Sequence, residues 1–353
     1  MAYKKTRVLH LLCSNIYSGA ENVACQIIQM FSDNETYEMF YCSPDGQIRQ
    51  ALKERNITFA PVAEVSITEI RRIIREVEPD IIHAHDMKAS FFAALTCNKI
   101  PLISHIHNNS FESQRISVKS FLYKIAARKA KHIFWVSKAA FDGYVFQDVI
   151  MGKSSILYNI VDAKKIQAKA KTDCHNYDYD IVYVGRLTYP KNPQRLVKVL
   201  STVCKNNGNA KIAIIGTGEM ENEVQLLINN LQLENNISLL GYSSNPYKIM
   251  QSAKVMIMTS RWEGLPMCAL EATALGLPIV STPTDGLKEL IDDGKTGFLS
   301  DIDDMLAEKC NQILSDEALY KEMHHRILLK SKNLLNVEKY YKQVETVYRE
   351  SLK

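Results

Sequence analysis

VMIMTSRWEGLPMCALEATALGLPIVST, residues 255–282, contains a strand, a helix and a second strand in one continuous segment. The run VMIMTS is apolar and typical of a buried strand. Pro266 suits the first position of a helix, and Gly276 with Pro278 ends that helix before the apolar run PIVST. A strand, a helix and a strand in this order indicate a parallel α/β sheet.

The same alternation runs through the whole chain. Short apolar runs rich in β-branched residues separate longer segments of helical period. Such runs indicate parallel sheets that are buried on both faces, and therefore the doubly wound α/β class. The other expected strands are RVLHLL (7–12), EMFYC (38–42), DIIHAH (80–85), LISHIH (102–107), IFWVS (133–137), SSILY (154–158), IVYVG (181–185), IAIIG (212–216) and ISLLG (237–241).

The length of the chain indicates two domains. At roughly 150 residues per domain, 353 residues are enough for two separate cores. Residues 164–180 are polar and lack a strand pattern, so we interpret them as a linker between two Rossmann-like domains. The predicted domains are residues 1–165 and 176–334. Residues 335–353 have the pattern of one amphipathic helix, which we expect to pack back on the first domain.

The composition excludes several classes of protein. An apolar content of 46% with a net charge of +4 excludes disorder, and the sequence has no apolar run of about 18 residues that could span a membrane. The apolar run near the start is too short for a signal peptide, so we expect a cytoplasmic protein. The eight cysteines include no CxxC pair, which indicates reduced thiols rather than a disulfide framework or a zinc site.

Two glutamates in residues 255–282 point to a ligand. Glu263, Gly264 and Leu265 form the loop before the helix, where free N–H groups and the helix dipole favour an anion such as phosphate. Glu271 lies further along this helix among apolar residues, where a carboxylate is costly to bury unless it accepts strong hydrogen bonds. A ribose diol would supply two such bonds. The alternative is that both glutamates are ordinary surface charges.

The motif Glu263-x7-Glu271 is accompanied by other characteristic pieces along nearly the whole chain. These are residues 18–21 (SGAE), 80–85 (DIIHAH), 136–138 (VSK), 159–162 (NIVD), 184–187 (VGRL) with 191–192 (KN), 215–218 (IGTG) and 292–298 (DDGKTGF), together with a strand that ends at His107. In this order they resemble the retaining glycosyltransferase family 4, whose members have the GT-B fold. The resemblance implies two Rossmann-like, doubly wound parallel-sheet domains that face each other across a cleft.

The resemblance also implies a reaction. A retaining hexosyl- or N-acetylhexosaminyltransferase would move the sugar of a nucleotide-diphospho-sugar, with a UDP-sugar the expected donor, to a hydroxyl acceptor. The C-terminal domain would bind the donor, and the N-terminal domain a saccharide or lipid-linked saccharide acceptor, in the assembly of a bacterial surface polysaccharide or glycolipid. The alternatives are a nucleotide-sugar epimerase of the same architecture and a non-catalytic protein that binds sugar nucleotides.

Two cations lie in the turn after the strand IVYVG. Arg186 and Lys191 could meet a diphosphate, Arg186 through its planar fork and Lys191 as a point charge, although a solvated basic turn is the simpler alternative. The resemblance gives both residues the diphosphate and places His107 near the transferred sugar. The catalytic residues it implies are Glu263, His107, Arg186 and Lys191. The donor-binding residues it implies are Gly19, Arg186, Lys191, Gly216, Tyr242, Glu263, Gly264, Leu265 and Glu271.

Several patterns suggest metal ligands, but we expect no metal and no cofactor. The His-x-His pairs His83/His85 and His105/His107 put side chains on one face of a strand end, yet no carboxylate-rich cluster accompanies them in the sequence. The Asp-x-Asp strings 178/180 and 301/303 do not follow a strand of a first Rossmann half. The family members that the chain resembles need no metal, and the nucleotide-sugar is a substrate.

The basic segment 117–131 suggests a partner surface. Residues 1–165 carry 21 Lys and Arg against 16 Asp and Glu, and this segment adds to that excess. Its helical period predicts Phe121, Leu122, Ile125 and Ala126 on the inner face. The outer face is either a solvated basic surface or a contact with an anionic membrane, which would make the protein peripheral on the inner face of the plasma membrane. Nucleic acid is not expected, because aromatic residues do not interleave the charges.

Overall fold

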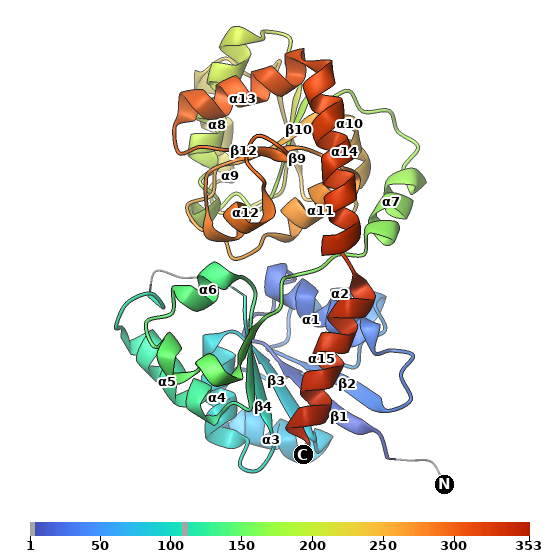
Figure 1. The fold of residues 1–353 in the computed structure, drawn as a ribbon, viewed down its shortest axis with the longest axis vertical. Coiled ribbons are helices and arrows are strands. Elements are labelled where there is room, and N and C mark those ends of the chain that lie inside the picture. The colour runs from blue at the N-terminus through green and yellow to red at the C-terminus, as the bar shows by residue number, and fades with distance from the viewer. Residues whose placement is uncertain (1–3, 108–111) are drawn as a thin grey trace. The chain divides into compact units, whose positions relative to one another are not determined.

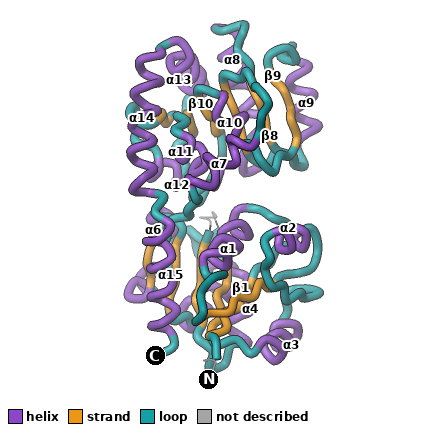
Figure 2. The backbone as a smooth tube through the Cα atoms, turned by 90° about the vertical axis from the view of Figure 1, so that its right-hand side faces the viewer, coloured by secondary structure: helices purple, strands orange, loops and turns teal. Residues whose placement is uncertain are grey.

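The computed structural model describes residues 4–107 and 112–353, and the chain divides into two compact units (Figure 1). The first unit consists of Met1–Asn159 together with Glu338–Lys353, and the second is Ile160–Val337. Each unit has one six-stranded sheet of parallel strands, with helices on both sides of the strands (Figure 2). The predicted doubly wound α/β class is confirmed for both units.

The sheet of the first unit has the strand order β2-β1-β3-β4-β5-β6. The order reverses at β1, and the carboxyl ends of the strands beside such a reversal are where open α/β sheets bind ligands. The strands are β1 (Thr6–Leu11), β2 (Tyr37–Cys42), β3 (Ile81–His85), β4 (Leu102–Ile106), β5 (His132–Trp135) and β6 (Ser154–Ile156). The helices are α1 (Gly19–Met30), α2 (Ile48–Glu54), α3 (Ile67–Val77), α4 (Met87–Thr96), α5 (Val118–Lys129), α6 (Lys138–Asp142) and α15 (Val337–Ser351).

The sheet of the second unit has the order β12-β11-β10-β7-β8-β9, so its reversal lies between β7 and β10. Its strands are β7 (Ile181–Val184), β8 (Ile212–Ile215), β9 (Ile237–Gly241), β10 (Val255–Met258), β11 (Ile279–Ser281) and β12 (Gly297–Leu299). Its helices are α7 (Ala163–Thr172), α8 (Pro193–Asn206), α9 (Glu221–Asn230), α10 (Tyr247–Ser252), α11 (Met267–Leu275), α12 (Asp285–Leu290), α13 (Asp303–Ser315) and α14 (Glu317–Leu334). The segment 255–282 forms β10, α11 and β11, as predicted.

Helix α15 belongs to the first unit although it ends the sequence (Figure 1). Its inner face buries Tyr340, Val344, Val347 and Tyr348. The Tyr341 ring packs against Phe31 of the segment that follows α1, with 4.5 Å between the ring centroids. The predicted return of the C-terminal helix to the first domain is therefore seen in the structure.

The structure differs from the prediction in the segment 164–180, which was interpreted as a linker. Residues 163–172 form α7, which packs on α10 and α11 of the second unit. Asp162 starts this helix, because its side chain accepts the backbone N–H of Lys165 (3.1 Å). The division between the units therefore lies at Asn159, before the predicted boundary at residue 165. A short helix whose inner face is only Ile166 and Ala170 has too weak a pattern to stand out in a lysine-rich segment.

The predicted inner face of the basic helix is also wrong in part. In α5 the buried residues are Ser120, Tyr123, Ala126 and Ala127, whereas Phe121 is 55% and Ile125 42% exposed. The Tyr123 hydroxyl is within 2.9 Å of Ser104 on β4, which fixes the rotation of the helix. A buried hydrogen bond thus decides which face meets the sheet, against the simple apolar pattern. Over the described residues, no helix is both long enough and apolar enough to cross a membrane.

Candidate active site

Glu263 is the centre of a small charged cluster between β10 and α11. Lys191 Nζ donates to Glu263 Oε1 (2.5 Å), and the Ser260 hydroxyl donates to the same oxygen (2.6 Å). The side chains of Lys191 and Glu263 are only 16% and 10% exposed. Lys191 lies in the loop that follows β7, and Glu263 lies in the loop that follows β10. The sheet order reverses between these two strands, and ligands of open α/β sheets bind at the carboxyl ends of such strands. The structure therefore brings together two of the predicted catalytic residues.

The turn that carries Lys191 is held against the loop that carries Glu263. Tyr189–Lys191 form a short 3₁₀ turn, and Asn192 follows with φ 54°. Arg261 donates to Asn192 Oδ1 (3.0 Å), and its guanidinium lies 4.4 Å from the Tyr189 ring centroid. The backbone N–H of Arg261 also donates to the backbone carbonyl of Pro190 (2.8 Å). These contacts fix the position of Lys191 without using its ammonium group.

Lys191 remains a cation in this setting. Burial acts to lower its pKa, but the carboxylate of Glu263 outweighs that effect, and the pKa of Lys191 is raised. Arg186, in the exposed turn directly after β7, adds a second positive charge whose field reaches Lys191. The two predicted diphosphate cations thus lie within electrostatic reach of each other, one buried and one open to solvent.

Glycines allow the strand-end loops of this unit to touch. A Cβ at Gly216 (φ 138°) would lie 1.9 Å from the Gly185 carbonyl oxygen, and one at Gly218 would lie 2.3 Å from the Leu187 carbonyl oxygen. A Cβ at Gly286, on α12, would lie 1.5 Å from the carbonyl oxygen of Gly264. The sequence 216–218 is therefore a close-packing turn against the loop that carries Arg186.

Glu271 lies at the middle of α11 and is partly buried. The Tyr247 hydroxyl donates to Glu271 Oε1 (3.1 Å). Burial raises the pKa of Glu271, and the Tyr247 hydrogen bond and the charge of Lys169 act in the opposite direction. A carboxylate placed this way favours a ligand that brings further hydrogen-bond donors.

Gly264, Leu265 and Tyr242 complete the predicted residues of the second unit. Gly264 and Leu265 are buried in the turn before α11. Tyr242 follows β9 directly and is 72% exposed. Its ring is therefore available to a ligand, and simple packing in the core is excluded.

Gly19 opens α1 in the first unit, at the loop that follows β1. A Cβ at this position would meet no atom within 4 Å, so the start of the helix faces open space. The Ser18 hydroxyl donates to the buried Glu21 of the first turn (2.6 Å), which orders the loop. The role of Gly19 in donor binding remains a prediction.

His107 ends a cluster of five histidines on one face of the first sheet. His10 on β1, His83 and His85 on β3, and His105 on β4 are fully buried, and His107 directly follows β4 and is partly exposed. Register explains the cluster, because His10 lies beside His83 and His85 beside His105. Burial lowers the pKa of His10 and of His107 to about 3, so both rings are neutral near pH 7.

The histidine cluster contains two groups of three side chains that are close enough together to be considered as metal ligands. Two groups, His10/His83/His85 and His85/His105/His107, have nitrogens within 4.8 Å of one another. Among the described residues neither group includes a carboxylate to offset the charge of a cation. The Asp-x-Asp strings have other roles, because Asp178 pairs with Lys211 and Asp303 with Arg195.

Comparison with known proteins gives the family of the chain. Residues 164–328 match the family described as "Glycosyl transferases group 1", and residues 17–165 match "Glycosyltransferase Family 4". The chain belongs to the family 4 glycosyltransferases. Both halves of this glycosyltransferase are thus covered, and the chain is a transferase of the GT-B type.

Individual relatives support the same assignment. An uncharacterized glycosyltransferase of Methanocaldococcus jannaschii is 31% identical over 61% of this chain, which spans 58% of that protein. The UDP-Gal:alpha-D-GlcNAc-diphosphoundecaprenol alpha-1,3-galactosyltransferase of Escherichia coli is 23% identical over 86% of both chains. The solved structure of Anabaena HepE in complex with UDP-glucose has a TM-score of 0.85 at 19% identity, with coverage of 98% of this chain and 99% of that one. The last comparison confirms the fold.

The geometry adds residues of this glycosyltransferase that the sequence analysis did not assign. Ser260 and Tyr247 each bind one of the two glutamates, and Arg261 with Asn192 holds the Lys191 turn. Ser260 and Arg261 stand within the quoted motif, so their proximity to Glu263 was visible. Tyr247 lies 24 residues from Glu271, and no spacing in the sequence joins them.

We expect the histidine cluster to make the glycosyltransferase sensitive to acid. The folded state holds the pKa values of all five rings below 6.5, because burial disfavours imidazolium. Between pH 6.5 and about 3 the unfolded chain therefore binds more protons than the folded protein. The free energy of unfolding is therefore highest above pH 6.5 and decreases as the pH falls below that value. The decrease is up to about 1.4 kcal/mol per pH unit for each histidine. Thermal unfolding between pH 4.5 and 7.5 measures this slope.

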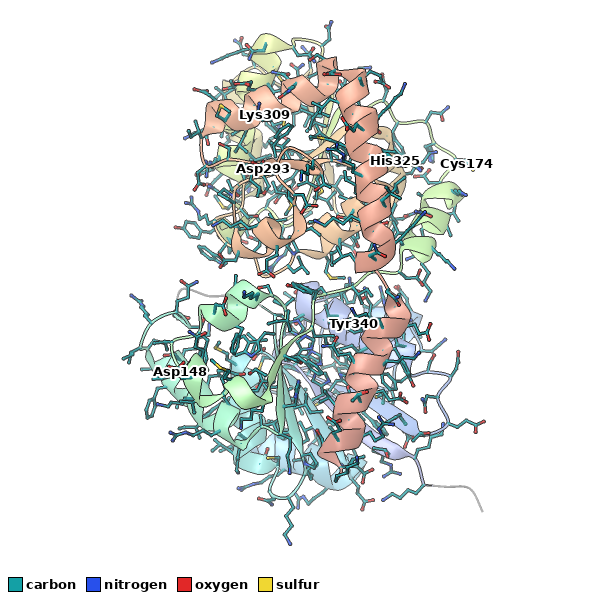
Figure 3. The ribbon with its side chains drawn as sticks, viewed as in Figure 1. Asp148, Cys174, Asp293, Lys309, His325 and Tyr340 are labelled. Atoms are coloured by element: carbon teal, nitrogen blue, oxygen red, sulfur yellow. The ribbon has the colours of Figure 1, made fainter. Side chains whose placement is uncertain are left out.

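The variant His105→Leu should have a shallower slope, by about one proton, because His105 is buried and neither of its ring nitrogens has a partner among the described residues. His325→Leu is the matched control, since His325 is exposed on α14 (Figure 3). Equal slopes in the wild type and in His105→Leu would contradict the neutral, buried state of the cluster.

Proposed function

We propose that the protein is a retaining glycosyltransferase that moves a hexosyl or N-acetylhexosaminyl group from a UDP-sugar to a hydroxyl of a lipid-linked saccharide. The observation that carries this proposal is the buried Lys191–Glu263 pair beside the start of α11, with Glu271 about one turn further along the same helix. The E. coli relative is named for a UDP-Gal donor and a diphosphoundecaprenol acceptor, and HepE was solved with UDP-glucose. These names support the choice of donor and acceptor class.

The proposed mechanism is electrostatic. The departing nucleoside diphosphate develops negative charge, and Lys191, Arg186 and the N–H groups at the start of α11 can stabilise it. Glu271 would hold the ribose of the nucleotide, and Tyr242 would lie against its base. Cations of the protein would then replace a divalent metal, so we propose transfer without metal or another cofactor.

In the proposed mechanism Glu263 acts on the transferred sugar as an oriented charge. Its Oε1 accepts from both Lys191 and Ser260, so the carboxylate is held in one orientation and one of its oxygens is already engaged. This arrangement favours a stabilising role over that of a free covalent nucleophile. Attack by the acceptor hydroxyl on the same face as the leaving group, with retention of configuration, is the step that the proposal requires.

Incubation with labelled UDP- and GDP-sugars and with lipid-linked saccharides in excess EDTA tests the proposed function. We expect transfer from a UDP-sugar, with a rate that added Mg²⁺ or Mn²⁺ changes by less than about twofold, because Lys191 and Arg186 already supply the positive charge. Interconversion of the sugar without transfer would favour an epimerase, and binding alone a non-catalytic protein. Loss of activity in EDTA that metal restores would contradict the metal-independent mechanism.

Substitution of Glu271 and substitution of Glu263 should affect different steps of the reaction. Glu271→Gln should weaken the binding of UDP, which has a ribose and no sugar, because ribose contacts are made in ground and transition states alike. Glu263→Gln should leave UDP affinity nearly unchanged and lower kcat by about 10²-fold or more, as the loss of a positioned electrostatic group does. Calorimetric titration with UDP and steady-state kinetics separate the two effects.

Glu234→Gln is the matched control for both variants, because Glu234 is an exposed glutamate between α9 and β9. It should retain the wild-type affinity for UDP and the wild-type kcat. The opposite pattern, with Glu263→Gln affecting UDP and Glu271→Gln affecting only kcat, would reverse the assigned roles.

We further propose that α5 rests on an anionic membrane surface. Val118 is 78%, Phe121 55% and Ile125 42% exposed, so the helix presents an apolar stripe to solvent. Basic side chains, Lys119, Lys124 and Arg128 among them, belong to the same helix. Apolar residues beside lysines and arginines are typical of helices that lie in the headgroup region. A lipid-linked acceptor would be reached from such a surface.

Co-sedimentation with vesicles measures this attachment. Binding should require phosphatidylglycerol over phosphatidylcholine and weaken with salt, because the attraction of surface charges is screened over about 8–10 Å. Phe121→Ser should weaken binding roughly tenfold, since burial of a Phe side chain is worth about 1.5–3 kcal/mol. Leu226→Ser, at an exposed apolar residue of α9, is the control and should bind as the wild type. Equal binding of wild type and Phe121→Ser would leave α5 as a solvated basic face.

A further inference from the structure

The exposed tyrosine and tryptophan residues of the second unit lie at one edge of its sheet. The structure describes every residue of this unit, and the side chains in question are Tyr189, Tyr242 and Trp262, which are 56%, 72% and 42% exposed. They belong to the loops that follow β7, β9 and β10. Because ligands of open α/β sheets bind beyond the carboxyl ends of the strands, these rings are exposed where a ligand is expected.

Two of these rings are neighbours. The centroids of Tyr189 and Trp262 are 5.8 Å apart, and the ring planes are inclined by 58°. Trp262 immediately precedes Glu263, and Tyr189 lies two residues before Lys191. Consecutive Cα atoms are about 3.8 Å apart, so along the backbone both aromatic residues lie within about 8 Å of the charged pair. We call Tyr189 and Trp262 the aromatic wall.

The aromatic wall is held in place before a ligand binds. The guanidinium of Arg261 lies 4.4 Å from the centroid of the Tyr189 ring, and Arg261 Nε donates to the Tyr189 carbonyl (3.3 Å). The backbone N–H of Tyr189 donates to Glu219 Oε1, also at 3.3 Å. The loops after β10 and β8 thus both hold Tyr189. A rigid aromatic surface loses little conformational entropy on binding, so most of its contact energy can contribute to affinity.

The base of a nucleotide does not account for the aromatic wall. In the proposed function the base lies against Tyr242, which follows β9. In the sheet order, β9 is separated from β7 by β8, and β10 lies beyond β7. At about 4.8 Å per strand, the loop after β9 begins about 10 Å from the loop after β7 and about 14 Å from the loop after β10. A base on Tyr242 therefore leaves the aromatic wall to another part of the donor.

The transferred sugar is the part of the donor that is expected nearest to the aromatic wall. In a nucleotide-sugar the sugar is bonded directly to the diphosphate, and the proposed function places that diphosphate at Lys191. A hexosyl ring has hydroxyl groups around its rim and C–H groups on its faces. These C–H groups are weakly positive and the face of an aromatic ring is negative, so the two attract each other. The Tyr189 hydroxyl and the Trp262 indole N–H can also donate to hydroxyl groups of the sugar.

We propose that the aromatic wall packs against the C–H face of the transferred sugar, so that the protein binds a nucleotide-sugar more tightly than the nucleotide alone. Tyr189 and Trp262 are then sugar-binding residues of the second unit, and the contact needs nothing from the first unit. The proposal rests on the proposed function, because the diphosphate has to lie at Lys191 for the sugar to reach the wall. It adds to that function a surface that recognises the ring of the sugar.

The fluorescence of the full-length protein reports on the aromatic wall directly. The chain has two tryptophans, of which Trp135 is 1% and Trp262 42% exposed. Acrylamide should therefore quench Trp262 and not Trp135, and Trp262→Leu should abolish the quenchable emission. Without an acceptor, UDP-glucose, UDP-galactose or their N-acetylamino counterparts should lower the quenching constant about twofold or more, because a sugar packed on the indole covers one of its two faces. UDP alone should leave the quenching constant unchanged.

Calorimetric titration measures the strength of the contact. Trp262→Leu removes the ring but keeps an apolar side chain beside Glu263, so the affinity for the UDP-sugar should fall about 3- to 10-fold, the range expected for an aromatic contact. The affinity for UDP should stay as in the wild type, which also shows that the variant is folded. Trp262→Phe keeps an aromatic ring and should restore most of the affinity for the UDP-sugar. A merely structural defect would weaken the binding of UDP and of UDP-sugar alike.

Tyr179→Leu is the matched control. Tyr177 and Tyr179 also form a pair of rings, with centroids 6.4 Å apart. They precede β7 and therefore lie at the opposite edge of the same sheet from the aromatic wall. Tyr179→Leu should bind both UDP and the UDP-sugar as the wild type does.

Two results would overturn the aromatic wall as a sugar-binding surface, whether or not the protein transfers a sugar. One is protection of Trp262 by UDP alone to the same extent as by UDP-sugars, and the other is no protection by any UDP- or GDP-sugar. Protection by a GDP-sugar and by no UDP-sugar would support the wall and overturn the UDP donor of the proposed function. The failure of one proposal can therefore be distinguished from the failure of the other.

Discussion

The ion pair between Lys191 and Glu263 is the contact on which the second unit's site depends. Two charges so little exposed lose much hydration, and their attraction does little more than compensate that loss, so the pair is a poor source of stability. Its effect is geometric. It ties the loop after β7 to the loop after β10, the two strands at which the sheet order reverses. The glycine contacts 216–185 and 286–264 bring the loop after β8 against the loop after β7, and α12 against the loop after β10. Separation of the pair would leave a buried charge on either side, so the loops keep one arrangement before a ligand arrives.

Much of the fold could be predicted because parallel sheets have a strong local signal. All eleven predicted apolar runs contain a strand, and Pro266 and Gly276 mark the limits of α11 within one residue. Weak elements were missed for physical reasons. Strand β12 has three residues at the sheet edge and was recognised only as part of a family motif, and α7 has too narrow an apolar face. The face of α5 was assigned wrongly, because a buried Tyr123–Ser104 hydrogen bond, and not the largest apolar side chains, sets its rotation.

The site was predictable where its residues share a motif or follow a strand. Glu263, Glu271, Arg186 and Lys191 all satisfy that condition. The observed adjacency of β7 and β10 then brings the loop of Arg186 and Lys191 beside the loop after β10. The partners that orient them could not be predicted. Tyr247 reaches Glu271 from another helix, and Tyr348 reaches His83 from the last helix, and each contact depends on the register of elements that the sequence does not order in space. His-x-His spacing likewise suggested ligands for a metal, whereas the rings are joined to one another.

The return of α15 to the first unit has a consequence for synthesis of the chain. The surface that receives Tyr340, Val344 and Tyr348 is made by residues up to Asn159, but the helix that covers it follows the entire second unit. At roughly 5–20 residues per second, a ribosome needs on the order of ten seconds or more to make the intervening residues. During that interval the nascent first unit lacks its last helix and exposes apolar surface that a chaperone can bind. Completion of its core waits until residues 338–353 have been made, so the unit that is begun first is completed only after the second unit has been synthesised.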